Sequence, residues 1–530
     1  MTTVRDATLE ILRKRGMTKI FSNPGSTEVA FLVDLPSDLE FVLGLHEGSV
    51  VGMATGYALG RGEPSFVLLH TTPGLGNAVS ALATSRVNRA PLVVCVGQQD
   101  RRHLAHEPFL AGKLAGLAGE YPVWVDQPVR PQDVPGAIER AWHEAQTRHG
   151  PALVIVPMDD WPAPAPEAYE LAAPDRLLRA AGADPETVEE LAVLIDGAKS
   201  PVLVAGAGAD SPEAWAALVA LAERLAVPVW QEPFGARAGF PQTHPLYMGD
   251  LSADRARLRE TLSGHDVVLV VGAPAFRQYA YAEGPFVEDG TVVAVVTEDP
   301  AEAQRSRAQL SVLGPPAPVC AALAERLAQR EAESPPPRQP LEPPSPDDPL
   351  RAGHVLAELA ARLPENVVVL EEAPSNRPEM LARLPARQNL GLISPAMGGL
   401  GFAMPAAIGL RMALPERPVV AIVGDGSSLY AIQSLWSAAT YKSGPLLVIL
   451  KNGGYAIMDR LAEHEGGASA WPNVDVDIAG LAEIFGCETR RIADLESLQK
   501  TLDEVVPGLA ERTEPLLLEV AVEPDASFRP

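Results

Sequence analysis

Residues 419–427 read VVAIVGDGS, five apolar residues followed by a Gly-Asp-Gly turn. Uniformly apolar strands are typical of parallel sheets whose two faces are both covered by helices. Similar runs recur along the chain, with helical stretches such as residues 213–225 and 355–362 between them. This alternation predicts doubly wound, parallel-sheet α/β domains. Nine further strands are predicted at residues 65–69, 92–96, 152–156, 202–205, 267–271, 292–296, 367–370, 446–450 and 516–522.

Two stretches rich in proline predict where the domains are joined. They are WPAPAPEAYELAAPD at residues 161–175 and SPPPRQPLEPPSPDDP at residues 334–349. Such sequences favour extended, semi-rigid linkers. We therefore expect an N-terminal domain at 1–165, a central domain at 176–333, a Pro-rich linker at 334–349 and a C-terminal domain at 350–530. Each domain is long enough for its own core.

The composition excludes several classes of protein. The 530 residues are 47% hydrophobic and 21% charged, which is ordinary for a globular protein. A net charge of −25 does not suit binding of nucleic acid or an anionic membrane over the bulk surface. The cysteines Cys95, Cys320 and Cys487 are too scattered to predict a disulfide framework or a cysteine zinc site. Because no apolar run is long enough to span a membrane, and the N-terminus has no apolar signal core, we expect a cytoplasmic protein.

Polar residues follow two of the apolar strands in the C-terminal third. Asp425 and Asn452 lie just after the predicted strands at 419–423 and 446–450 and are 27 positions apart. A carboxylate, an amide oxygen and a loop carbonyl suit Mg²⁺, whose other positions phosphate oxygens and water fill. The adjacent glycines let the backbone approach a diphosphate closely. A Gly-Asp-Gly turn alone is common at strand ends, but the second strand with its Asn-Gly makes this pattern much more specific.

In the N-terminal third, three consecutive strand ends present Ser26, Glu47 and His70. A hydroxyl, a carboxylate and an imidazole on one edge of a sheet are suited to acid–base chemistry. The same residues also suggest a hydrolase with Ser26 as nucleophile. The sequence around Ser26 has no G-x-S-x-G elbow, which disfavours that alternative.

Together these motifs resemble the thiamine-diphosphate-dependent decarboxylase family, most of all its benzoylformate decarboxylase type. The matching segments are NPGS at 23–26, Glu47, GHDVVLVVGAPAFR at 264–277, GGLGFAMPAAIG at 398–409, and GDGS at 424–427 with Asn452. The resemblance extends over essentially the whole chain. It implies pyrimidine-binding, central and diphosphate-binding domains, and the cofactors thiamine diphosphate and Mg²⁺.

The resemblance also implies roles for single residues at the cofactor. Glu47 would hydrogen-bond the aminopyrimidine ring, although without the other motifs a solvated turn residue would be the favoured interpretation. Asp425, Asn452 and the Gly454 carbonyl would bind Mg²⁺. Leu400 would hold the cofactor in a bent form while also packing in the core. The implied cofactor-binding residues are Asn23, Glu47, Ser375, Gly398, Leu400, Gly424, Asp425, Gly426, Ser427, Asn452 and Tyr455.

For the substrate, the resemblance implies that Ser26 hydrogen-bonds the carboxylate of a 2-oxo acid and that His70 transfers protons. His70 also reads as an ordinary strand-end histidine. The side-chain pocket would be apolar, which favours an aromatic or branched aliphatic substituent, although each of its members also reads as a core residue. The implied pocket residues are Phe109, Leu110, Ile457 and Leu461.

One position departs from the benzoylformate decarboxylase pattern. These enzymes carry an active-site histidine two residues after the arginine of GAPxFR, whereas here Arg277 is followed by Gln278 and Tyr279. A phenol gives up its proton less readily at neutral pH than an imidazolium does. Tyr279 is thus either a slower catalytic acid or a sign that the product-forming intermediate attacks a second aldehyde, as in carboligation.

Three functions remain open at this point. The first is decarboxylation of a 2-oxo acid to an aldehyde and CO₂. The second is a carboligase or aldehyde lyase that uses the same cofactor, and the third is a non-catalytic subunit of the same fold. The resemblance implies a homodimer with shared active sites that pairs into a homotetramer. A dinucleotide site at residues 206–211, GAGADS, is disfavoured because the third glycine of the fingerprint is missing.

Overall fold

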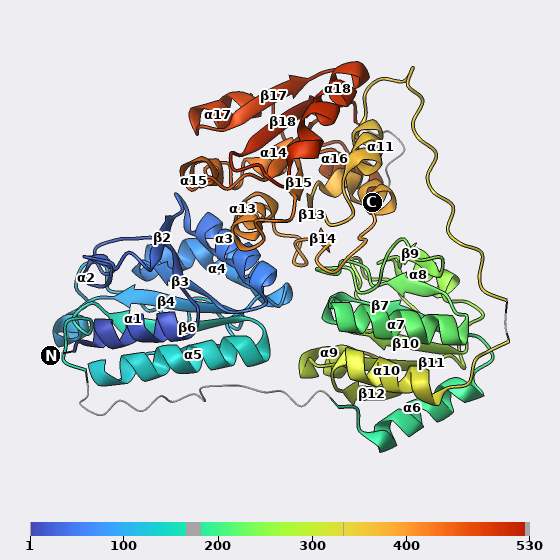
Figure 1. Ribbon diagram of the computed structural model, residues 1–530, viewed down its shortest axis with the longest axis horizontal. Coiled ribbons are helices and arrows are strands. Elements are labelled where there is room, and N and C mark those ends of the chain that lie inside the picture. Colours follow the sequence, from blue (N-terminus) through green and yellow to red (C-terminus); the bar gives the residue numbers. More distant parts are fainter. Residues whose placement is uncertain (1, 166–181, 332, 525–530) are drawn as a thin grey trace.

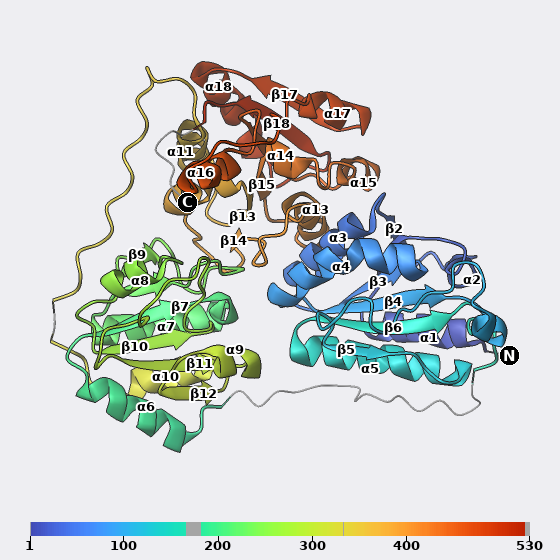
Figure 2. The same cartoon turned by 180° about the vertical axis from the view of Figure 1, so that it is seen from behind.

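The chain forms three parallel β-sheets of six strands each, one in each third of the sequence (Figures 1 and 2). The computed structural model describes residues 2–165, 182–331 and 333–524. Helices lie against the sheets, and most strands are fully buried, which confirms the predicted doubly wound α/β fold. The predicted central-domain start at residue 176 lies outside the described residues, as do residues 525–530.

The N-terminal sheet has the strand order β2-β1-β3-β4-β6-β5. Its strands are β1 (Lys19–Asn23), β2 (Glu40–Leu43), β3 (Ser65–Leu69), β4 (Leu92–Gln98), β5 (Trp124–Asp126) and β6 (Pro151–Pro157). Its helices are α1 (Val4–Lys14), α2 (Val29–Leu32), α3 (Glu47–Arg61), α4 (Thr71–Val87) and α5 (Val134–Arg148).

The central sheet has the order β12-β11-β10-β7-β8-β9, which is the arrangement of dinucleotide-binding folds. Its strands are β7 (Pro201–Ala205), β8 (Val229–Gln231), β9 (Tyr247–Asp250), β10 (Val267–Val271), β11 (Val292–Thr297) and β12 (Leu310–Leu313). Its helices are α6 (Pro185–Gly197), α7 (Pro212–Leu225), α8 (Arg255–Thr261), α9 (Pro300–Arg305) and α10 (Pro316–Arg326).

The C-terminal sheet repeats the N-terminal topology, with the order β14-β13-β15-β16-β18-β17. Its strands are β13 (Val368–Glu372), β14 (Leu392–Ile393), β15 (Val419–Gly424), β16 (Leu446–Lys451), β17 (Glu488–Ile492) and β18 (Leu516–Ala521). Its helices are α11 (Ala352–Arg362), α12 (Arg377–Arg383), α13 (Ala403–Ala413), α14 (Asp425–Ser428), α15 (Ser434–Thr440), α16 (Ala456–His464), α17 (Ile478–Ile484) and α18 (Leu495–Val505).

This topology determines where ligands can bind. In open parallel sheets a crevice forms outside the carboxyl ends of the strands, where the direction of winding reverses. The reversal falls between β1 and β3 in the N-terminal sheet and between β13 and β15 in the C-terminal sheet. The segments that leave these four strands therefore lie where a site is expected.

The N-terminal and C-terminal domains meet through α3 and α13, which lie side by side in Figures 1 and 2. A Cβ atom on Gly56 would lie 2.0 Å from the Ala406 carbonyl oxygen, and one on Gly409 would lie 1.8 Å from the Met53 carbonyl oxygen. Because such distances are impossible for a real side chain, these two glycines allow the helix backbones to touch. The contact joins two domains that are far apart in sequence.

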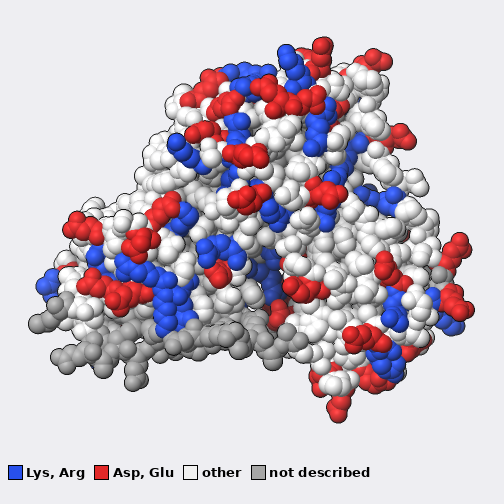
Figure 3. All heavy atoms as spheres, in the orientation of Figure 1, with Lys and Arg blue, Asp and Glu red and all other residues white. Residues whose placement is uncertain are grey.

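The Pro-rich segment 334–349 contains no helix or strand and runs along the outside of the molecule (Figure 1). Two arginines fasten it to the C-terminal domain. Arg338 donates to the Ala382 carbonyl at 3.1 Å, and Arg383 donates to the Glu342 carbonyl at 2.9 Å. On the face shown in Figure 3, acidic and basic side chains are interspersed over all three domains.

Candidate active site

Glu47 is the first residue of α3 and is buried at the carboxyl edge of the N-terminal sheet. Two amide side chains donate hydrogen bonds to its carboxylate. Asn23, at the end of β1, lies 3.3 Å from Oε1, and Asn77, on α4, lies 3.0 Å from Oε2. Asn23 is a predicted site residue, whereas no sequence motif pointed to Asn77. Together they fix the direction in which the Glu47 carboxylate points.

His70 lies directly after β3 and caps the N-terminus of α4. Its Nδ1 atom lies 3.0 Å from Oε2 of Glu28 and 2.9 Å from the Thr27 hydroxyl. The Glu28 carboxylate also accepts the Gly25 N–H at 2.8 Å and a hydrogen bond from Thr27. Burial raises the pKa of Glu28, although the neighbouring donors partly oppose that rise. The imidazole is therefore held through Nδ1, which leaves Nε2 to exchange a proton with a bound molecule.

Ser26 lies in the same turn but is exposed. Among the described residues, the hydroxyl that contacts the His70 ring is that of Thr27, not Ser26. The turn passes so close to the imidazole that a Cβ on Gly25 would lie 2.4 Å from the ring. Ser26 is thus near His70 without the serine–imidazole hydrogen bond that activates a nucleophile, which further disfavours a hydrolase.

Asp425 and Asn452 follow neighbouring strands of the C-terminal sheet, because β15 pairs with β16 up to Gly424 and Leu450. Asp425 is buried, and this burial raises its pKa. Its carboxylate accepts the N–H groups of Gly453 at 2.7 Å and Gly426 at 2.8 Å. The Asn452 side-chain oxygen accepts the Gly454 N–H at 3.1 Å. The predicted magnesium ligands are thus brought together around one glycine-rich turn.

A cavity of about 280 Å³ opens beside this turn. Its lining includes Ser375, Asn452, Gly453 and Gly454 together with residues of α16. The Ser375 hydroxyl accepts the Ile457 N–H at 3.0 Å, which joins the end of β13 to the start of α16. The other predicted diphosphate contacts, Gly424 and Ser427, belong to the β15–α14 turn at the same sheet edge.

The residues present fit a magnesium diphosphate. The predicted metal ligands offer a carboxylate, an amide oxygen and a carbonyl, which is the hard-oxygen set that Mg²⁺ prefers. Glycine is required within this cradle, because a Cβ on Gly426 would lie 2.6 Å from the Tyr455 ring and Gly453 has a φ of +76°. The described residues contain no cluster of three His, Cys, Asp or Glu side chains, so a transition-metal site of that type is not found among them.

Gly398 and Leu400 belong to the loop between β14 and α13. Gly398 has a φ of +71° and Leu400 is half-buried. The loop leaves the sheet next to β13, whose carboxyl end carries Ser375.

Tyr279 comes from the central domain and is 70% exposed. Its ring lies 6.1 Å from that of Phe234, and the Arg277 side chain donates to the Phe234 carbonyl at 2.7 Å. The Arg377 guanidinium lies 5.3 Å from the Phe234 ring centre. Arg377 follows Ser375 by two residues, so Phe234, the neighbour of Tyr279, contacts the C-terminal domain close to the cavity.

The four predicted pocket residues fall into two pairs. Ile457 and Leu461 lie one turn apart on α16 and are half-buried. Phe109 and Leu110 lie in the N-terminal domain, where Phe109 is 87% exposed and Leu110 has a φ of +66°. Within one chain the second pair therefore does not form the wall of a closed pocket.

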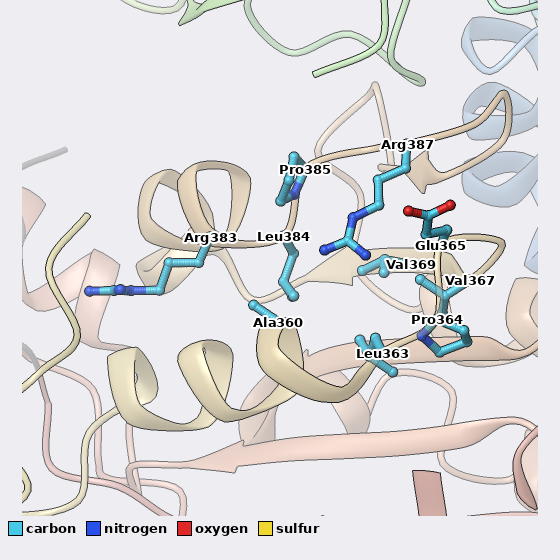
Figure 4. A pocket seen from close by; sticks show the side chains of 10 residues that line it. All are labelled: Ala360, Leu363, Pro364, Glu365, Val367, Val369, Arg383, Leu384, Pro385 and Arg387. Atoms are coloured by element: carbon cyan, nitrogen blue, oxygen red, sulfur yellow. The ribbon is translucent and has the colours of Figure 1, made fainter. Parts of the chain in front are cut away.

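A second, much smaller pocket of about 20 Å³ lies between α11 and the segment that follows α12 (Figure 4). Its lining contains none of the predicted site residues. We therefore place the candidate site at the sheet edges and not in this pocket.

The glycine motif of the central domain has a structural role. A Cβ on Gly208 would lie 2.9 Å from the Gly272 Cα atom. The turn after β7 therefore packs directly against the backbone that follows β10. Asp210 forms an ion pair with Arg237 at 3.0 Å and accepts the Leu390 N–H at 3.1 Å. The motif thus joins the central and C-terminal domains.

Comparison with known proteins agrees with this geometry. Three models of the thiamine pyrophosphate enzymes match: the N-terminal TPP-binding domain at residues 2–113, the central domain at 188–323 and the C-terminal TPP-binding domain at 379–520. The chain belongs to the thiamine-pyrophosphate-dependent enzyme family.

One curated relative and two solved structures are similar to the chain over nearly its whole length. The chain is 38% identical to the benzoylformate decarboxylase of Pseudomonas aeruginosa over 98% of its own length and 99% of that protein. A 4-hydroxybenzoylformate decarboxylase from Rhodococcus jostii RHA1 superposes with a TM-score of 0.93 at 35% identity, covering 99% of this chain and 100% of that one. A benzoylformate decarboxylase from Polynucleobacter necessarius superposes with a TM-score of 0.94 at 33% identity, covering 100% of both chains.

Within its described residues the protein has no helix with the length and apolarity of a membrane span.

Proposed function

We propose that the protein catalyses the non-oxidative decarboxylation of a 2-oxo acid with an aromatic or branched apolar side chain. The products are the corresponding aldehyde and CO₂, with benzoylformate as the model substrate. The observation that supports this most is the similarity to a benzoylformate decarboxylase over almost the full length of both chains. The cofactors are thiamine diphosphate and Mg²⁺.

Residues of the C-terminal domain bind the cofactor's charged end in this proposal. Asp425, Asn452 and the Gly454 carbonyl would hold Mg²⁺, and the β15–α14 turn would bind the diphosphate, with Ser375 and Ser427 as hydroxyl partners. Because Asp425 is buried, its charge would be screened less than in bulk water, which would strengthen its attraction for the metal. When bound, thiamine diphosphate supplies a carbon nucleophile and an electron sink for the pair released with CO₂.

Residues of the N-terminal domain handle protons. The buried Glu47 side chain would share a proton with the aminopyrimidine ring of the cofactor, and Asn23 and Asn77 fix its orientation. Ser26 donates a hydrogen bond to the substrate carboxylate. His70 moves a proton through Nε2, while Glu28 holds Nδ1.

The working unit in this proposal is a homodimer with shared active sites, and two such dimers form a tetramer. Two observations support sharing. Residues of the N-terminal domain are absent from the lining of the cavity beside Asn452, and the predicted pocket residue Phe109 is 87% exposed. Sedimentation of the purified protein tests this point, and a monomer at active concentrations would contradict it.

The reaction is tested with thiamine diphosphate, Mg²⁺ and benzoylformate, measuring CO₂ and benzaldehyde together. Equal release of both, dependent on the cofactor, supports decarboxylation. CO₂ without matching aldehyde points to the carboligase alternative, which the exposed Tyr279 in place of a histidine favours. No CO₂ from benzoylformate, from 4-hydroxybenzoylformate or from branched aliphatic 2-oxo acids rejects the proposal.

A further inference from the structure

The loop from Pro395 to Gly401 lies between β14 and α13 and contains Gly398 and Leu400, both predicted to contact the cofactor. Its backbone depends on glycine at Gly398 and Gly401, where φ is +71° and +89°. A Cβ on Gly398 would meet nothing within 4 Å, so packing around this glycine does not hold the loop in place. Other groups must fix its conformation.

Glu372 holds the C-terminal end of the loop. It is the last residue of β13 and is 1% exposed. Its carboxylate accepts three consecutive backbone N–H groups, from Gly401 at 2.6 Å, Phe402 at 2.8 Å and Ala403 at 2.6 Å. Helix α13 has no side-chain N-cap of its own. The Glu372 carboxylate, which comes from strand β13, accepts the first backbone N–H groups of the helix instead.

Asn88 holds the N-terminal end of the loop. It is completely buried and ends helix α4 of the N-terminal domain. Its amide donates to the Ser394 carbonyl at 3.0 Å and accepts the Ala396 N–H at 3.1 Å. Its own carbonyl accepts a hydrogen bond of 2.7 Å from Arg237 of the central domain. All three domains thus meet at this end of the loop.

We propose that Asn88 and Glu372 are positioning residues that clamp the 395–401 loop at both ends in the conformation that receives the cofactor. This proposal rests on the proposed cofactor site. Neither side chain belongs to the predicted set of cofactor contacts, so their effect is exerted through the backbone of the loop. Because removal of either acceptor leaves buried N–H groups without a partner, the loop without its clamp samples conformations that do not bind the cofactor.

The test is calorimetric titration of the full-length apoprotein with thiamine diphosphate in excess Mg²⁺. Glu372→Gln and Asn88→Ala should each weaken binding by about tenfold or more, since a lost hydrogen-bond partner in a buried site has about that effect. Saturating cofactor should restore most of kcat, because neither residue takes part in the chemistry. Hydrogen exchange of the 394–403 amides in the apoprotein should become faster in both variants.

Glu139→Gln is the matched control. Glu139 is completely buried and paired with Arg15 in the N-terminal domain, so this variant loses stability without altering the loop. Asn88→Asp, which removes the donor to the Ser394 carbonyl, replaces Asn88→Ala if the alanine variant does not fold. Unchanged affinity and unchanged amide exchange in the Glu372 and Asn88 variants would overturn the clamp. Failure of the wild type to bind the cofactor would overturn the cofactor assignment instead, and amide exchange would still decide the clamp.

Discussion

Glu28 and His70 form a carboxylate–imidazole pair in which Oε2 lies 3.0 Å from Nδ1, with the Glu28 side chain completely buried. Glu28 lies in the segment that follows β1, and His70 lies directly after β3. The winding of the N-terminal sheet reverses between these two strands. The pair fixes the orientation of the imidazole.

Glu28→Gln should lower kcat by about ten- to hundredfold, as loss of a carboxylate that orients a histidine does elsewhere. Cofactor affinity should stay the same, because Glu28 contacts the His70 turn and none of the predicted cofactor ligands. Steady-state kinetics and calorimetry on the same preparation measure the two quantities. A variant with wild-type kcat would show that His70 does not need this partner.

Glu47→Gln should lower the rate of CO₂ release by at least about a hundredfold, which is the usual size of a general acid–base contribution. The amide has nearly the size of the carboxylate, and one of the two asparagines can flip its own oxygen toward the new NH₂ group, so binding of thiamine diphosphate should persist. The exposed residue Glu63 provides the control variant Glu63→Gln. If wild type and Glu47→Gln behave alike in every assay, the non-catalytic alternative gains and the catalytic proposal fails.

Asp425→Asn should raise the Mg²⁺ concentration needed for cofactor binding by about tenfold or more, because it removes the only charged ligand of the predicted set. Titration with Mg²⁺ at fixed thiamine diphosphate measures this. Asp459→Asn is the matched control, since Asp459 lines the same cavity but is bonded to the Trp471 indole at 3.0 Å. Equal magnesium dependence in both variants would contradict the assignment of Asp425.

Tyr279→His should raise aldehyde release relative to CO₂ at neutral pH, because an imidazolium donates a proton more readily than a phenol. Tyr279→Phe should lower that ratio. Both substitutions affect a side chain that is 70% exposed, so stability should change little. Identical product ratios in Tyr279→Phe and wild type would exclude Tyr279 as the proton donor.

Glu232→Gln should alter the pH dependence of stability. Burial raises the pKa of Glu232 from 4.5 to about 8, although Arg277 lies 3.5 Å away. The folded protein thus holds this proton more tightly than the unfolded chain does, and the resulting stabilisation is complete below about pH 4.5 and is lost as the pH rises towards 8. In thermal unfolding, the Tm of Glu232→Gln minus the Tm of the wild type should therefore increase as the pH rises from 4.5 to about 8. The exposed Glu325→Gln is the control, and a difference that stays constant with pH would contradict the prediction.

The sequence predicted the interior of the fold better than its edges. All ten strands predicted from apolar runs are present, within one or two residues of their expected ends. Strands such as β14, which has two residues, and β17, which reads ETRRI, were missed. The buried strand β14 is too short to form a recognisable apolar run, and the edge strand β17 is charged because most of its side chains are partly exposed to solvent.

A similar distinction holds for the site. Asp425 and Asn452 were predicted because residues at the ends of neighbouring parallel strands meet at one edge. Glu28, Asn77 and Glu372 were not, because each acts on a partner in another element and no spacing along the chain reveals it. Glu28 lies in the same turn as Ser26, so an acidic residue beside a predicted active-site residue was the signal in the sequence that could have pointed to it.

The close packing of α3 against α13 has a consequence for synthesis. All but three of the 15 residues of α3 are buried, and part of that burial comes from a helix that begins more than 340 residues later. While the ribosome makes the central and C-terminal domains, the glycine-lined face of α3 in the nascent N-terminal domain is therefore exposed to solvent. We expect this intermediate to aggregate or to require a chaperone, so N-terminal fragments that end before α13 should be insoluble when expressed alone.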